Sequence, residues 1–234
     1  MSIECYRGLS NDFWGRSTVL GCFVCRFAFG ICPLLCIFQG SLWSIPNVQR
    51  HLLWSRLLPS NFLIYLGKRF GYVVSGIDTV PYITSRLPSH IVRNGVKIGE
   101  FYHQDLLTFE SNQTYDVVCS FGFIEHFSNF EDVIEKHIRL VKPRGTLILS
   151  CPNFRGLQYI LHRLLDPTNL HRHVLSAMNL RRWRMLLERN SMVLQYHGYY
   201  RKAGFWWDTP TSSFSVMPAR SLVGIVTGKI PHRT

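Results

Sequence analysis

The sequence predicts an α/β domain built on a doubly wound, mainly parallel sheet with helices on both faces. From about residue 61 onward, short runs of branched and aromatic residues alternate with longer amphipathic segments. This alternation is typical of βαβ units, which place parallel strands side by side. The chain has 234 residues, of which 47% are apolar. That length and composition suit one such domain with a substantial core and an additional segment.

Each expected element follows from its local pattern. Strands are predicted near residues 72–77, 98–103, 115–120, 145–151, 192–198 and 221–228. Helices are predicted near residues 61–70, 81–93, 129–141, 155–165 and 179–189.

The clearest helix is the segment 129–141. Asn129 is a residue type that caps helices, and two acids in the next turn favour the positive end of the helix dipole. Pro143 and Gly145 are expected to end the helix. Its buried stripe is expected to contain Val133, Ile134, His137, Ile138 and Val141. Segment 179–189 likewise separates an apolar face from an arginine-rich face.

The net charge of +12 is concentrated late in the chain. Between Lys136 and Lys202 there are thirteen Lys and Arg residues but only two acids, Asp166 and Glu188. Such a surface suits an anionic partner, which could be an acidic substrate, a lipid headgroup or nucleic acid. A solvated basic face is the alternative. The sequence contains no dedicated nucleic-acid motif, such as a zinc finger or an RNA-recognition signature.

The seven cysteines do not indicate a secreted disulfide framework. Their number is odd, and five of them lie in the first 36 residues. Four are embedded among Phe, Leu and Ile rather than in polar loops, so no metal site is expected. We therefore predict a reducing, cytoplasmic compartment.

The first 56 residues differ from the rest and are predicted to be a hydrophobic, Cys-rich extension of a domain spanning 57–234. Within the extension, the segment 18–38 is long enough to cross a bilayer and carries one charge, Arg26. Arg26 and Pro33 both disfavour a membrane helix. Membrane association through 18–38 and a buried or poorly structured extension are both open.

The strongest pattern is "YDVVCSFGFIEHFSNFEDVIEKHIRLVKPRGTLILSCPN", Tyr115 to Asn153. A strand, a Glu-His turn, a helix, a Lys-Pro-x-Gly turn and a second strand follow in order. This block resembles the centre of class I S-adenosylmethionine-dependent methyltransferases of the small-molecule type. The resemblance runs from about Phe62 to Ile230. It implies a Rossmann-like sheet, S-adenosylmethionine as methyl donor and a small-molecule acceptor.

The resemblance also implies donor contacts at the carboxyl ends of the strands, where ligands of open α/β sheets bind. Asp78 stands where a carboxylate accepts the ribose hydroxyls; a turn or helix-capping role is the alternative. Asp105 stands near the expected adenine with Leu106 beside it, although Asp105 also suits an ordinary turn. The residues expected along the methionine part of the donor are Ser120, Phe121 and Gly122.

The acceptor side is expected to begin with Glu125 and His126. His126 could be a general base, because the ordinary pKa of histidine lies near neutrality; a structural or capping role is the alternative. Asn153 is expected at the mouth of the fifth strand. His171 and His173 belong to a basic segment that would suit a carboxylate or phosphate on the acceptor. A solvated loop would have the same composition.

One part of the family pattern is not recognisable. Members carry an E/D-x-G-x-G-x-G turn after the first strand, where glycines let the backbone approach the donor. Here the turn position holds Leu-Pro-Ser-Asn, and no glycine stands between Gly40 and Gly67. The first 60 residues could be an aberrant start, or a divergent loop could still hold the donor. A methyltransferase-like scaffold that has lost donor binding is a third explanation. The alternative function is a catalytically inactive, methyltransferase-like interaction protein, with or without membrane attachment.

Overall fold

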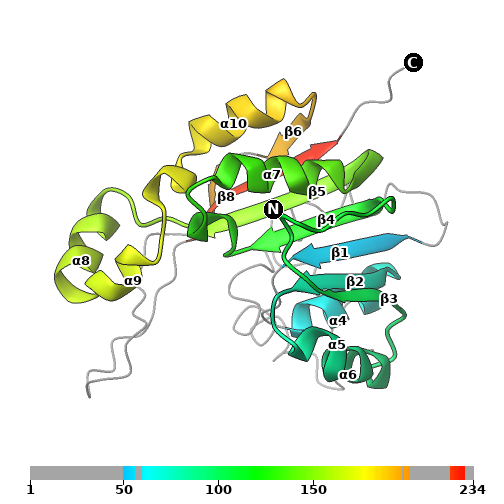
Figure 1. Ribbon diagram of the computed structural model, residues 1–234. Coiled ribbons are helices and arrows are strands. Elements are labelled where there is room, and N and C mark those ends of the chain that lie inside the picture. Colours follow the sequence, from blue (N-terminus) through cyan, green and yellow to red (C-terminus); the bar gives the residue numbers. More distant parts are fainter. Residues whose placement is uncertain (1–49, 56–59, 197, 201–221, 230–234) are drawn as a thin grey trace, which may run out of the picture. The chain divides into compact units, whose positions relative to one another are not determined.

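The computed structural model describes residues 50–55, 60–196, 198–200 and 222–229 (Figure 1). Most of the predicted extension, including its apolar segment 18–38, lies outside these ranges. Among the described residues, no helix has the length and apolar character needed to cross a membrane. Membrane attachment through 18–38 therefore stays a prediction from the sequence.

The described residues form one sheet with strand order β3-β2-β1-β4-β5-β8-β6, and β7 also pairs with β8. Strands β1 to β5 are parallel, whereas β8 runs antiparallel to β5 and β6. The order progresses outward in both directions from β1 and β4, so the predicted doubly wound sheet is confirmed. The strands are β1 (His51–Ser55), β2 (Val73–Asp78), β3 (Ile98–His103), β4 (Tyr115–Phe121), β5 (Val141–Pro152), β6 (Val193–Tyr196), β7 (Tyr199–Tyr200) and β8 (Leu222–Lys229).

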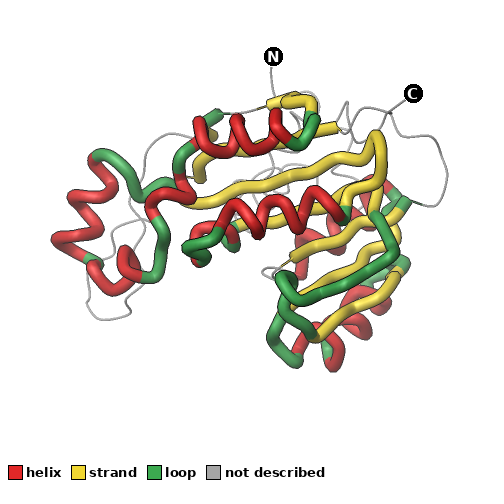
Figure 2. The backbone as a smooth tube through the Cα atoms, turned by 45° about the horizontal axis from the view of Figure 1, so that its top comes forward, coloured by secondary structure: helices red, strands yellow, loops and turns green. Residues whose placement is uncertain are grey.

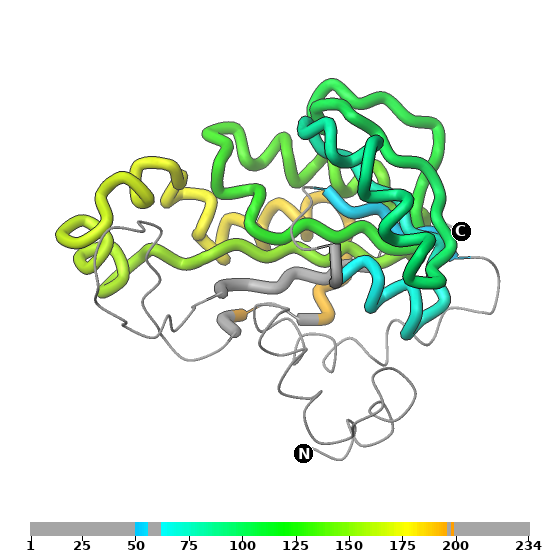
Figure 3. Tube along the Cα trace, turned by 90° about the horizontal axis from the view of Figure 1, so that it is seen from below, coloured from blue at the N-terminus to red at the C-terminus, as the bar shows by residue number. Residues whose placement is uncertain are grey.

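Helices cover both faces of the sheet, as predicted (Figure 2). Figure 3 shows α4 and α7 on opposite sides of the strands. The helices are α4 (Ser60–Phe70), α5 (Tyr82–Ser85), α6 (Leu87–Arg93), α7 (Phe130–Arg139), α8 (Leu157–Leu165), α9 (Pro167–His171) and α10 (Leu180–Arg189). Two short 3-10 helices, η2 (Ile124–His126) and η3 (Leu175–Met178), lie in the connections.

Strand β1 is the first strand that the sequence pattern left unassigned. Leu52, Leu53 and Trp54 are each at most 1% exposed, as expected of a central parallel strand covered on both faces. The backbone N–H of His51 donates to Asp116 Oδ2 at 2.8 Å, which fixes the start of the strand against β4. The sheet therefore begins inside the segment that the sequence placed in the extension, six residues or so before residue 57.

Helix α7 carries four of the five residues of the predicted buried stripe, whereas Val141 is buried as the first residue of β5. Val133, Ile134 and His137 are fully buried against the sheet. The expected cap is wrong in its detail: the Asn129 side chain accepts no backbone N–H and instead donates to Asp132 Oδ2 at 3.2 Å. Burial of the stripe, rather than the cap, therefore holds α7 in place.

Two element boundaries differ from the expected ones. The single helix expected over 81–93 is divided into α5 and α6, because Pro88 in the first turn of α6 lacks the N–H that would continue the helix. Strand β5 begins at Val141 and so contains Pro143. Its pairing with β4 is irregular between Tyr115 and Val117. The early start of β5, not Pro143, thus ends α7.

Helix α10 lies beside α7, and its apolar face belongs to the same buried core as the apolar face of α7. Trp183 is 1% exposed, and its Nε1 donates to the Ala177 carbonyl at 2.7 Å. On the outer face, Arg182 binds Glu131 at 2.8 Å and Arg189 reaches the same helix. Exposed ion pairs of this kind contribute about 1 kcal/mol at most. Burial of Trp183 is therefore the main reason why α10 docks here.

Candidate functional site

Polar residues gather where strands β2, β1 and β4 end. Ser55 is the last residue of β1 and lies beside Ile77 in β2 and Ser120 in β4. In Figure 1, the arrowheads of β1 and β4 point toward α8 and α9. The strand order changes direction between β1 and β4, and open α/β sheets bind their ligands at such a point. We call the residues at these strand ends the carboxyl edge; they are Ser55, Asp78, Ser120, Phe121 and Gly122.

The turn after β4 requires glycine. Gly122 has φ +63°, a left-handed conformation that costs other residues free energy, and a Cβ there would lie 3.5 Å from Glu125 Oε1. Its N–H donates to the Ser150 carbonyl at 3.0 Å. Just before it, the buried Ser120 hydroxyl has no hydrogen-bond partner in the described part of the chain. The turn thus places the backbone of Gly122, which has no side chain, and the buried hydroxyl of Ser120 at the carboxyl edge.

Asp78 ends β2 at the same edge and is partly exposed. Its Oδ1 accepts the N–H of Val80 at 3.3 Å, which starts the turn toward α5. Its carbonyl accepts the N–H of Gln104 at 3.0 Å, so the ends of β2 and β3 are tied together. The Asp78 carboxylate thus takes part in the turn that leaves β2 at the carboxyl edge.

Asp105 and Leu106 follow β3 but lie in different surroundings. Asp105 is exposed, and its Oδ1 accepts the N–H of Leu107 at 3.0 Å. Leu106 is 3% exposed and belongs to the core that α7 covers, together with Ile77 and Phe109. Asp105 thus lies at the surface, whereas Leu106 packs in the core, and an adenine contact of either residue stays a prediction.

An aromatic cluster lies beneath the carboxyl edge, on the face covered by α4. The Phe121 ring centroid is 4.7 Å from that of Trp54 and 5.4 Å from that of Phe62. Trp54 and Phe62 are themselves 4.8 Å apart. The sequence did not indicate this cluster, because its three rings come from β1, α4 and β4. The cluster rigidly supports Phe121 next to the Gly122 turn.

Ser55 also makes a buried contact on the opposite face of the sheet. Its Oγ lies 2.6 Å from His137 Nε2, and His137 Nδ1 lies 2.6 Å from the Val133 carbonyl. A carbonyl only accepts, so Nδ1 carries the proton and Nε2 accepts from the serine hydroxyl. Burial lowers the pKa of His137 to about 4, which keeps the ring neutral. The sequence placed His137 only in a buried stripe.

Glu125, His126 and His173 form a cluster beyond the Gly122 turn. Their potential ligand atoms all lie within 4.8 Å of one another. Glu125 Oε1 is 3.9 Å from His126 Nε2, and the centroids of the two imidazole rings are 4.7 Å apart. One carboxylate and two imidazoles at this spacing could exchange a proton with a substrate or hold a divalent cation. The sequence predicted all three residues but not that they meet.

The segment around α9 holds this cluster in place. The Arg172 carbonyl lies 3.0 Å from His126 Nδ1, and the Val174 N–H donates to the Glu125 carbonyl at 2.6 Å. His173 Nδ1 lies 2.6 Å from the Asn169 carbonyl. Each imidazole thus has Nδ1 directed at a carbonyl oxygen, which leaves Nε2 as its basic nitrogen.

The other two predicted acceptor residues do not belong to the group of ligand atoms formed by Glu125, His126 and His173. Asn153 follows β5, and its Oδ1 accepts the N–H of Arg155 at 3.1 Å in a local turn. His171 is the exposed last residue of α9.

The buried thiols of Cys119 and Cys151 are free. Burial raises the pKa of Cys151 well above its ordinary value, and the nearby Glu125 carboxylate raises it further. Burial also raises the pKa of Cys119. Neither thiol is therefore suited to nucleophilic chemistry at neutral pH.

The connection between β1 and α4 has the length of the family turn but not its residues. Counted from the end of β1, Ser55 stands at the acidic position of E/D-x-G-x-G-x-G, and Leu57, Pro59 and Asn61 stand at the glycine positions. Residues 56–59 lie outside the described ranges. Because strand β1 is present, the departure from the family's glycine-rich pattern is confined to the residues of this connection.

Comparisons with known proteins agree with this architecture. A family model described as a methyltransferase domain matches residues 59–207, more than half of the chain. A ubiquinone biosynthesis O-methyltransferase of Rickettsia canadensis (strain McKiel) is 32% identical over 91 residues, which cover 39% of this chain and 38% of that protein. A mitochondrial protein of the same name from Dictyostelium discoideum is 31% identical over 75 residues, covering 32% of this chain and 23% of that protein. The matches thus span less than two-fifths of these relatives.

Solved structures share the fold over most of the chain. A putative methyltransferase from Bacillus halodurans C-125 has a TM-score of 0.62 at 14% identity and covers 85% of this chain and 99% of its own. The N-methyltransferase NodS from Bradyrhizobium japonicum WM9, solved with S-adenosyl-L-homocysteine, has a TM-score of 0.55 at 12% identity. That match covers 97% of this chain and 98% of NodS. These likenesses concern the fold. The domain match, the strand order and the motif block together show that the chain belongs to the class I S-adenosylmethionine-dependent methyltransferase family.

Proposed function

We propose that this protein transfers a methyl group from S-adenosylmethionine to a hydroxyl oxygen of a small-molecule acceptor. The observation that carries the proposal is the strand order. Strands β2 and β4 flank β1 at the switch point, so Asp78 at the end of β2 and the Gly122 turn after β4 lie on either side of the end of β1. The curated relatives are named O-methyltransferases, which supports oxygen as the methylated atom.

The carboxyl edge supplies the donor contacts in this proposal. The Asp78 carboxylate accepts hydrogen bonds from the ribose hydroxyls. Gly122 has no side chain, so the methionine part of the donor can approach its backbone closely. The Ser120 hydroxyl, buried and unpartnered within the described residues, supplies one further polar contact. Asp105 lies at the exposed adenine end. The connection from Ser55 to Asn61 would then hold the donor without its glycines.

The cluster of Glu125, His126 and His173 supplies acceptor activation. His126 Nε2 removes the proton of the acceptor hydroxyl, and the Glu125 carboxylate at 3.9 Å stabilises the resulting imidazolium. The oxygen attacks the methyl carbon in line with the sulfonium. As the O–CH₃ bond forms, the S–CH₃ bond breaks, and S-adenosylhomocysteine leaves as a neutral thioether.

The same cluster also supports a second variant of this chemistry, in which a divalent cation activates the acceptor hydroxyl. A divalent cation bound by Glu125, His126 and His173 would lower the pKa of a coordinated acceptor hydroxyl and so replace the general base. The separation of their ligand atoms, 4.8 Å at most, is the observation that supports it. The two variants differ in their response to a chelator.

The direct test is transfer of a radiolabelled methyl group from S-adenosylmethionine to simple catechols, with and without a carboxylate substituent. Replacing a general base lowers turnover by about 10² to 10⁴-fold. His126→Gln should therefore reduce kcat by that factor and leave donor affinity unchanged. His90→Gln on α6 is the matched control and should retain full activity.

A chelator should abolish turnover only if a cation is bound, and added Mg²⁺ or Zn²⁺ should then restore it. Equal activity of His126→Gln and the unmodified protein would contradict both variants. If the carboxylate-bearing catechol is the better acceptor, the basic segment around α9 has the role proposed for it in acceptor binding.

A further inference from the structure

Helix α8 has its apolar side chains on the outside. Leu157 and Leu164 are 70% and 73% exposed, and Ile160 is 53% exposed. Its one buried residue is His162, whose ring packs against Phe154 with 4.1 Å between centroids. A helix on the surface of a globular domain normally shows the reverse arrangement, with polar residues facing water.

These exposed residues form one continuous face. Leu157, Ile160 and Leu164 follow the i, i+3, i+7 spacing that places side chains along one side of a helix. Leu165, which is 50% exposed, extends the same side. Single exposed apolar residues are ordinary, whereas a contiguous group indicates an interaction site. We call these four residues the α8 face.

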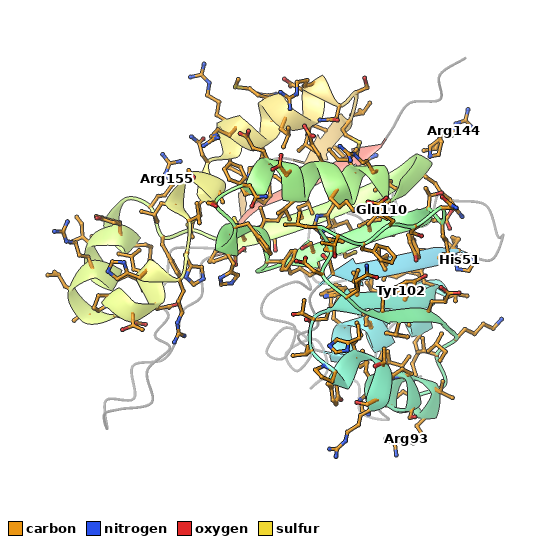
Figure 4. The ribbon with its side chains drawn as sticks, in the orientation of Figure 1. His51, Arg93, Tyr102, Glu110, Arg144 and Arg155 are labelled. Atoms are coloured by element: carbon orange, nitrogen blue, oxygen red, sulfur yellow. The ribbon has the colours of Figure 1, made fainter. Side chains whose placement is uncertain are left out.

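In the described segment around the α8 face, the exposed arginine and acidic side chains are all positive. Arg155, Arg163 and Arg172 are exposed, and Figure 4 shows Arg155 on the segment that leads from β5 into α8. Asp166 is the only acid between Asn153 and Leu187 in the sequence, and it is 3% exposed. The surface around the α8 face is thus apolar at its centre and cationic at its rim.

We propose that the α8 face docks on an anionic phospholipid bilayer. A short helix with leucines and isoleucine on one side and arginines beside them lies well in a bilayer interface, where the apolar side chains enter the acyl boundary and the arginines meet phosphates. A stable protein partner needs about 800 Å² on each side, with a polar rim. The absence of exposed acids in this segment favours the anionic bilayer.

The position of the α8 face connects this docking with the proposed reaction. Helix α8 leads directly into α9. Just after α9, the Arg172 carbonyl lies 3.0 Å from His126 Nδ1, and the His173 ring lies 4.7 Å from the His126 ring between centroids. An acceptor dissolved in the bilayer would therefore reach the cluster along the α9 side. This extension rests on the proposed function, whereas bilayer docking itself requires no methyl transfer.

The test is cosedimentation of the full chain with vesicles of phosphatidylcholine alone and with about one-third phosphatidylserine. We expect binding to the anionic vesicles that falls as salt is raised. Replacing Leu157, Ile160 and Leu164 by Gln should weaken it at least tenfold. The matched control replaces Val80, Val92 and Met185, which are 48%, 52% and 61% exposed elsewhere. Arg155→Gln and Arg163→Gln should each weaken binding about fivefold.

A second measurement locates the contact. Brominated acyl chains should quench the added emission of Leu164→Trp but not that of Met185→Trp on α10. The proposal is overturned if the triple α8 variant binds vesicles as the unmodified chain does. It is also overturned if that variant only changes the oligomeric state, because a second copy would then cover the face. Donor affinity measured on the same variant should be unchanged, which separates failure of docking from failure of the proposed function.

Discussion

The pairing of Ser55 with His137 shows how one buried residue links two elements at the candidate site. Ser55 ends the central strand at the start of the donor connection, and His137 lies on α7. The imidazole has both nitrogens in short contacts, with Ser55 and with the Val133 carbonyl. Its neutral form fits these partners, because Nε2 must accept while Nδ1 donates.

This pairing predicts acid sensitivity of the fold. Burial lowers the pKa of His137 to about 4, whereas an unfolded chain binds the proton near pH 6.5. The stability that neutral His137 contributes is therefore complete above pH 6.5 and is lost as pH falls toward 4, by about 3 kcal/mol. Urea unfolding at pH 7 and pH 4.5 should show this decrease, and His137→Gln should flatten it. An equally steep decrease in His137→Gln would assign the effect to other groups, such as the buried His162.

At the scale of elements, the position of β1 depends on a charged anchor. Asp116 Oδ2 accepts both the His51 N–H at 2.8 Å and Lys142 Nζ at 2.9 Å. Asp116→Ala leaves a partly buried N–H and a lysine without this acceptor, and should lower the free energy of unfolding by about 2 kcal/mol. Asp116→Asn keeps an acceptor and should cost less. Glu188→Ala removes an exposed ion pair and should change stability by less than about 0.5 kcal/mol. Equal losses for Asp116→Ala and Glu188→Ala would contradict the anchor.

The sequence predicted the elements that a local residue pattern identifies, such as α7. It missed β1, which is identified only by its pairing with distant strands. Helix α7 has a full apolar stripe, so its core residues could be predicted from periodicity. Strand β1 has Leu-Leu-Trp without β-branched residues and lacks the glycine turn that normally marks its end. Its identity comes only from pairing with β2 and β4.

The same distinction holds for the candidate site. Glu125 and His126 are adjacent in the chain, so their motif could be recognised. The contact between His126 and Arg172 spans 46 residues and depends on how α9 folds back. The contact between Ser55 and His137 spans 82 residues across two elements. No local spacing encodes such pairs.

At the scale of the whole molecule, the domain boundary can be placed by truncation. The unit that contains every described residue begins at residue 47. We propose that the chain from residue 47 onward unfolds cooperatively. The chain from residue 57 onward lacks β1, so β2 and β4 lose their shared partner and expose unpaired edges. It should aggregate or unfold without a cooperative transition. Thermal unfolding by circular dichroism compares the two, and a cooperative transition in the shorter chain would contradict the central role of β1.

The central claim is that the carboxyl edge binds S-adenosylmethionine although its connection lacks glycines. Titration calorimetry of the full chain with S-adenosylmethionine tests it most directly. We expect saturable binding that Asp78→Asn weakens by about tenfold or more, because hydrogen bonds to a carboxylate are lost. Glu188→Gln should bind as the unmodified chain does. A folded chain that binds no donor at millimolar concentration would contradict the claim and would favour a catalytically inactive methyltransferase scaffold.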